Sequence, residues 1–147
     1  MKFIKRPISV PSNYRFFYQI SILLLIIEIN CAKNTGASIL KFQLLAWTLR
    51  DDYGYHSLIK VAKSKNNKSS FNFWALDPAL NRAIEFALAD GFLILQNEKF
   101  ISASKGDDLL KYILEADIFS NEKKILKEFG KLVTESFVTS ILKKENA

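Results

Sequence analysis

Hydrophobic positions within residues 77–114 follow a pattern that predicts a helix, a tight hairpin and a second helix. In the first of these helices, apolar residues recur at the i, i+3, i+4, i+7, i+8 spacing of one helix face: Leu80, Ala83, Ile84, Ala87 and Leu88. Asp77 and Pro78 suit the helix start, because Asp accepts hydrogen bonds from free amides and Pro needs no amide hydrogen there. Gly91 suits the helix end, because glycine readily takes the left-handed conformation.

The hairpin is predicted from two β-prone segments, Phe92–Leu95 and Phe100–Ile101, with Asn97 and Glu98 forming a tight turn between them. Ser104 and Asp107 then resemble a capping box with Asp in place of Glu. They precede a helix with one apolar face, made of Leu109, Leu110, Ile113 and Leu114. Helix, hairpin and helix in this order indicate a winged helix-turn-helix.

The rest of the chain predicts further helices and a basic arm. Helices are expected at residues 12–30, 38–49, 51–63 with a break near Gly54, and 122–142 as one continuous helix. Residues 64–70 read as an exposed loop, and residues 71–74 as an extended aromatic segment that packs on the core. The expected fold is mainly α, a winged helix-turn-helix with a two-stranded wing and extra N- and C-terminal helices. Residues 1–11 form the basic arm, and residues 12–147 form a single winged-helix domain.

The apolar run Phe16–Ile29 also permits a membrane or export reading, since basic residues precede it. Gln19 and Glu28 interrupt the run, which is shorter than the roughly 20 residues that span a bilayer. A lipoprotein-type cleavage before Cys31 would require a small residue where Asn30 stands. A buried helix in a cytoplasmic protein is therefore the favoured interpretation, and the lone cysteine fits a reducing compartment.

Charge is distributed unevenly along the chain, whose net charge is +6. Residues 1–68 carry 11 Lys or Arg against 3 acids, a balance of +8, and residues 69–147 carry 10 against 12, a balance of −2. The basic half suits an acidic partner such as DNA or an acidic protein surface, or it forms a solvated face without a partner. Candidate contacts are the cations Lys60, Lys63, Lys65 and Lys68, together with Lys2, Lys5, Arg6 and Arg15.

Catalytic and metal-binding motifs are not found in the sequence. His56 is the single histidine, and no second His or Cys stands near it, so the usual metal-ligand spacing is missing. Adjacent acids such as Asp107 and Asp108 point about 100° apart on a helix, which does not make an acid–base pair. The sequence predicts a protein that is not an enzyme, with no cofactor, no metal and no small-molecule substrate.

The predicted helix at residues 77–90 is a poor reader of DNA. Its one cation, Arg82, stands against Asp77, Glu85 and Asp90, a net charge of −2. A winged helix that reads DNA normally presents Lys and Arg to the phosphates. A protein-binding winged helix is favoured, with Arg82 and the aromatic residues Phe71, Phe73 and Trp74 as candidate protein-interface residues.

Three segments carry a resemblance to a known family: RPISVPSNYRFFYQISILLLIIEINC, FNFWALDPALNRAIEFALADGFLI and NEKFISASKGDDLL. Together they resemble the small middle component of bacterial ABC-type three-component systems, of which the Lamassu antiphage and antiplasmid systems are a branch. The resemblance covers roughly residues 6–135, and Asp-Pro-Ala-Leu-x-Arg-Ala from Asp77 to Ala83 is its strongest part.

The resemblance implies a non-catalytic adaptor encoded beside an SMC-like ATPase and a nuclease-type effector. Such a subunit would bridge the ATPase heads and the effector and restrain the effector until foreign DNA is sensed, with DNA contacted through the complex. The alternative is a stand-alone winged-helix transcriptional regulator that binds DNA, and an adjacent gene for an SMC-like ATPase would favour the adaptor.

Overall fold

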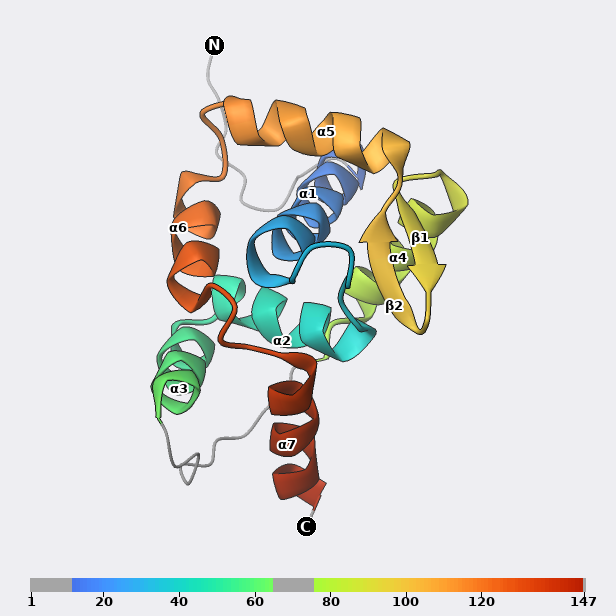
Figure 1. Ribbon diagram of the computed structural model, residues 1–147. Coiled ribbons are helices and arrows are strands. Elements are labelled where there is room, and N and C mark those ends of the chain that lie inside the picture. The colour runs from blue at the N-terminus through green and yellow to red at the C-terminus, as the bar shows by residue number, and fades with distance from the viewer. Residues whose placement is uncertain (1–11, 65–75, 147) are drawn as a thin grey trace.

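The computed structural model describes residues 12–64 and 76–146, which form a mainly helical fold with one small antiparallel sheet (Figure 1). The described elements are, in chain order, α1 (Ser12–Asn30), α2 (Ile39–Arg50), α3 (Asp52–Lys63), α4 (Pro78–Ala89), β1 (Leu93–Gln96), β2 (Lys99–Ser102), α5 (Ser104–Glu115), α6 (Ser120–Phe129) and α7 (Glu135–Asn146). The predicted arm at residues 1–11 and the aromatic segment at 71–74 lie outside the described residues.

Helix α1 forms the centre of the molecule, with α2, α4, α5 and α6 packed around it (Figure 1). Five consecutive residues, Ile22 to Ile26, are at most 2% exposed. A helix that is apolar on every side is stable when neighbours cover all of its faces, which explains why this segment resembles a membrane span. Among residues 12–64 and 76–146, no helix has the length and apolar character needed to cross a membrane.

Helices α2 and α3 begin where side chains cap their first amides. The Lys41 amide donates to Ser38 Oγ at 3.2 Å, and the Tyr53 amide donates to Asp51 Oδ1 at 3.0 Å. The expected break near Gly54 is wrong, because extended Asp51 ends α2 and Gly54 lies inside α3. Gly54 packs so closely on Trp47 that an added Cβ would stand 2.8 Å from the indole ring.

Helix α4 begins and ends where the sequence predicts, and both strands of the hairpin lie within one residue of their predicted ends. Asp77 Oδ1 accepts from the Ala79 amide at 3.1 Å, and Gly91 takes φ +83°. Asn97 and Glu98 have φ of 54° and 66°, as a two-residue turn of the I′ type requires. The strands pair from Leu93 with Ser102 to Gln96 with Lys99.

The predicted capping box at the start of α5 is wrong. Ala103 occupies the N-cap position, and no side chain accepts from the first amides there. Asp107 instead accepts from Ser102 Oγ at 2.5 Å, so its carboxylate is engaged with the end of β2 rather than with Ser104.

Ala37, between α1 and α2, forms an isolated antiparallel bridge with Phe100 of β2. Its amide donates to the Phe100 carbonyl at 3.1 Å, and the Phe100 amide donates back at 2.8 Å. Gly36, with φ +75°, allows the α1–α2 connection to approach β2 closely, and an added Cβ there would stand 2.4 Å from the Phe100 carbonyl oxygen. Only glycine fits this position without a backbone shift.

The predicted single helix at residues 122–142 is wrong, because the chain forms two helices, α6 and α7. Gly130 ends α6 with φ +52°. Asn30, at the end of α1, donates through Nδ2 to the carbonyls of Leu126 at 2.9 Å and Gly130 at 2.7 Å. The Leu126 carbonyl also accepts from the Gly130 amide at 3.0 Å, whereas the bond to the Gly130 carbonyl satisfies a group that a continuing helix would otherwise use.

Candidate functional site

Helix α4 presents a nearly neutral outer surface. Arg82 and Glu85 are exposed on it. Of its flanking acids, Asp90 pairs with Lys105 at 2.9 Å and Asp77 lies 4.0 Å from Arg50. Neighbouring cations therefore offset the acids at both ends of the helix, and its surface is less acidic than its sequence suggests. It remains without the cluster of cations that a phosphate-facing helix uses.

The hairpin carries an apolar surface at its free edge. Ile94 is 47% exposed and Leu95 is 53% exposed, and both belong to β1, whose other edge pairs with β2. The tip adds Glu98, which is exposed, and Lys99, which is partly buried. Successive side chains of a strand point to opposite faces, so each face of the hairpin has one of these exposed apolar side chains, on a strand whose outer edge is unpaired among the described residues.

Only part of the predicted basic run lies in the described residues. Lys60 and Lys63 are exposed on α3, and Lys63 Nζ lies 4.0 Å from Glu128 on α6. Arg15 is exposed near the start of α1, away from this pair in the chain. Lys65 and Lys68 lie outside the described residues.

Two further lysines, which the sequence analysis missed, enlarge this basic region. Lys124 and Lys127 are exposed on α6, three residues apart and so adjacent on its surface. Glu128 joins α6 to α3 through its contacts with Tyr55 Oη and Lys63. Lys60, Lys63, Lys124 and Lys127 together form what we call the α3–α6 basic surface. Their three-residue spacing is the signal in the sequence that indicates this adjacency on a helix.

The other predicted site residues cannot be placed. Lys2, Lys5 and Arg6 belong to residues 1–11, and Phe71, Phe73 and Trp74 belong to residues 65–75, both outside the described part of the chain. Their proposed contacts remain predictions.

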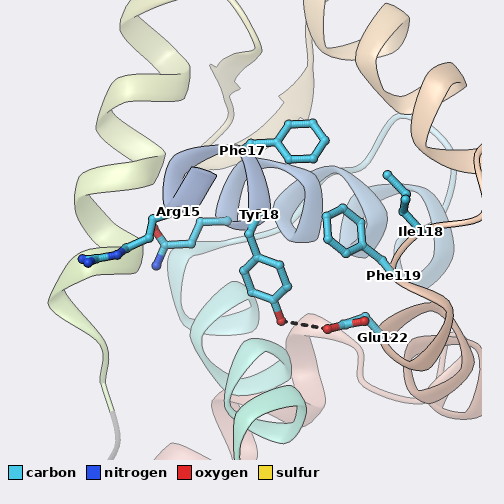
Figure 2. Close-up of a pocket in the computed structure, with 7 residues that line it drawn as sticks. Arg15, Phe17, Tyr18, Ile118, Phe119 and Glu122 are labelled. Atoms are coloured by element: carbon cyan, nitrogen blue, oxygen red, sulfur yellow. Dashed lines mark hydrogen bonds between the residues drawn. The ribbon is translucent and has the colours of Figure 1, made fainter. Parts of the chain in front are cut away.

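A groove that the sequence did not predict lies between α1 and the connection from α5 to α6 (Figure 2). Its volume is about 620 Å³, within the range of sites for drug-sized ligands. We call it the α1–α6 groove, and it is lined by Arg15, Phe17, Tyr18, Gln19, Ile118, Phe119 and Glu122.

Aromatic side chains from both sides build the α1–α6 groove. The Phe119 ring lies 5.8 Å from the ring of Phe17 and 5.4 Å from that of Tyr18, between centroids. Tyr18 Oη donates to Glu122 Oε2 at 3.2 Å, as Figure 2 shows. Burial raises the pKa of the Tyr18 phenol, and the Glu122 carboxylate raises it further. The groove is thus mostly apolar, and its charged lining residues are one cation, Arg15, and one carboxylate, Glu122.

Cys31 lies in the core, as the sequence predicts for a lone cysteine beside an apolar run. Burial raises the pKa of its thiol, which disfavours the reactive thiolate. In residues 12–64 and 76–146, no three His, Cys, Asp or Glu side chains gather as a metal site would require.

Comparisons with protein-family models, with curated proteins and with solved structures found no match for this chain.

Proposed function

We propose that this chain is a non-catalytic adaptor subunit of an SMC-like ATPase defence complex. In this role it bridges the ATPase heads and a nuclease-type effector and restrains the effector until foreign DNA is sensed. The proposal combines the resemblance carried by residues 6–135 with the surfaces described above. It places the protein in the cytoplasm, where both partners act.

The finer fold that accompanies this proposal is a winged helix. The order α4, β1, β2 and α5 supports it, as does the tight I′-type turn at Asn97 and Glu98. The bridge between Ala37 and Phe100 adds support, because it ties the connection between α1 and α2 to the second strand of the wing.

The observation that carries the proposal is the apolar edge of the wing. Ile94 and Leu95 are about half exposed, at a place where a DNA-reading wing would present cations. The neighbouring α4 offers one exposed Arg82 and one exposed Glu85. An apolar edge beside a nearly neutral helix favours a protein partner over a phosphate backbone.

The α3–α6 basic surface gives the adaptor a second, chemically different surface. Glu128 on α6 lies 4.0 Å from Lys63 on α3, and this one acid stands against the four exposed cations Lys60, Lys63, Lys124 and Lys127 of the two helices, a sum of about +3. This surface suits an acidic head domain, or DNA that the ATPase has already captured. Two different surfaces on one small domain are what a bridging subunit needs.

The test is co-expression with the SMC-like ATPase and effector of the same operon, followed by size-exclusion chromatography. The intact chain should co-elute with the ATPase. The double variant Ile94→Glu with Leu95→Glu should be released, because burying two new carboxylates in an apolar contact is strongly unfavourable.

Gln96→Glu provides the matched control, since it adds a carboxylate to the same strand without removing an apolar side chain. All variants should keep the melting temperature within a few degrees, because these side chains are exposed. A chain that never co-elutes with the ATPase would contradict the proposal and favour the stand-alone regulator. Loss of the ATPase from both variants alike would contradict the role of the apolar edge.

A further inference from the structure

We propose that the α1–α6 groove binds an uncharged aromatic small molecule of two or three rings, held between the α5–α6 connection and the side chains of α1. The residues that line the groove belong neither to the hairpin nor to the α3–α6 basic surface. The proposal is therefore independent of the adaptor role.

The α1–α6 groove has the size and lining of a small-molecule site. Its volume is about 620 Å³, and ligand sites of this size are mostly apolar, with a few polar groups. Phe17, Ile118 and Phe119 supply apolar walls, and each is only partly buried. A ligand that covers these walls gains free energy, because it removes their apolar surface from water.

Ring geometry favours an aromatic ligand. The Phe119 ring lies between those of Phe17 and Tyr18 (Figure 2), at 39° to the Phe17 ring and 76° to the Tyr18 ring. Offset and edge-to-face arrangements of this kind are the ones that aromatic rings prefer. A flat ligand can therefore extend the cluster by adding further contacts of the same type.

The charged residues of the lining favour an uncharged ligand. Arg15 on α1 and Glu122 on α6 sum to a formal charge of zero. Glu122 Oε2 accepts from Tyr18 Oη at 3.2 Å, so the phenol and the carboxylate already satisfy each other. A charged ligand would lose hydration on entering the groove without meeting a net opposite charge, and this loss is unfavourable.

The wall that carries Ile118 and Phe119 is held in place by α6. Lys123 Nζ donates to the carbonyl of Ile113 at 2.7 Å and to that of Ala116 at 3.1 Å, and the Lys123 amide donates to the Phe119 carbonyl at 2.8 Å. Phe119 has φ +55° and ψ +35°, a strained conformation of the kind that concentrates at ligand sites. A wall ordered in advance costs little entropy when a ligand binds.

The test is a fluorescence titration of the full-length chain against dilute N-phenyl-1-naphthylamine, an uncharged probe whose emission rises in apolar surroundings. We expect saturable binding with a Kd on the order of 10⁻⁴ M, as for a typical ligand of this size. Phe119→Ala and Phe17→Ala should each weaken binding about fivefold to tenfold, because each removes one aromatic contact.

Tyr112→Ala is the matched control, because it removes an aromatic side chain that is 58% exposed on α5 and does not line the groove. It should leave the affinity unchanged. Circular dichroism establishes that each variant is folded, and the two groove variants allow the test to proceed if one of them is not.

Displacement of the probe by three naphthalene compounds tests the charge of the ligand. Uncharged 1-naphthalenemethanol should displace it at the lowest concentration, and cationic 1-naphthylmethylammonium and anionic 1-naphthoate should each be at least about threefold weaker. Equal or stronger displacement by either charged compound would overturn the assignment to uncharged ligands. Absence of saturable binding, or unchanged affinity in a folded Phe17→Ala or Phe119→Ala variant, would overturn the site itself.

Discussion

Replacing Gly36 with Ala tests the contact between the α1–α2 connection and the hairpin. At φ +75°, an Ala side chain pays the cost of the left-handed conformation, about 1–2 kcal/mol. The new Cβ would also stand 2.4 Å from the Phe100 oxygen and 2.8 Å from Ile101 Cγ2, too close for either atom to remain in place.

The expected loss of stability in Gly36→Ala depends on the hydrogen bonds that the new Cβ would disturb. The two hydrogen bonds between Ala37 and Phe100 would stretch, and each contributes about 0.5–1.5 kcal/mol. Adding the conformational cost, we expect Gly36→Ala to lower the free energy of unfolding by about 2–5 kcal/mol.

Gly91→Ala is the matched control, because Gly91 has φ +83° while the nearest atom to its added Cβ, Lys105 Cδ, is 4.0 Å away. It should cost only the conformational term, about 1–2 kcal/mol. Urea unfolding followed by circular dichroism gives both values. If the two variants lose equal stability, the close approach of Gly36 to Phe100 does not contribute to stability and the reasoning fails.

Two further substitutions probe single side chains by urea unfolding. The pKa of Tyr18 is raised above its ordinary value of 10.0, so the phenol ionises at a lower pH in the unfolded chain than in the folded one. The free energy of unfolding should therefore fall as the pH rises above about 10. Tyr18→Phe should make that fall shallower, and an unchanged slope would contradict this reasoning. Asn30 is 1% exposed, and Asn30→Ala removes its bonds to the carbonyls of Leu126 and Gly130. That variant should lose about 1–3 kcal/mol, and unchanged stability would show that α6 ends without this side chain.

Local sequence signals were sufficient where the cause of the structure is local. Asp77 with Pro78 predicts the start of α4, and Asn97 with Glu98 predicts the turn of the hairpin, because capping and turn conformations depend on neighbouring residues. The buried helix at residues 12–30 is also predicted from its own segment, because Gln19 and Glu28 interrupt an apolar run that is too short to span a bilayer.

Features that depend on distant residues were missed. The end of α6 depends on Asn30, which lies 96 residues before Leu126 in the chain. Gly130 marked the break, but the apolar period around it favoured one long helix. The α1–α6 groove likewise joins Tyr18 to Glu122 across 104 residues, and the basic surface joins α3 to α6. Periodicity within one segment carries no information about such pairings.

The central claim is that the α4–hairpin unit contacts protein rather than reading DNA, and fluorescence anisotropy with the isolated chain tests it most directly. Labelled duplexes of several sequences should bind weakly and equally, with a Kd of roughly 10⁻⁴ to 10⁻⁶ M at physiological salt. Lys124→Glu with Lys127→Glu should abolish this binding, while Arg82→Ala on α4 should not change it. Tight binding to one sequence that Arg82→Ala removes would contradict the claim and identify α4 as a DNA-reading helix.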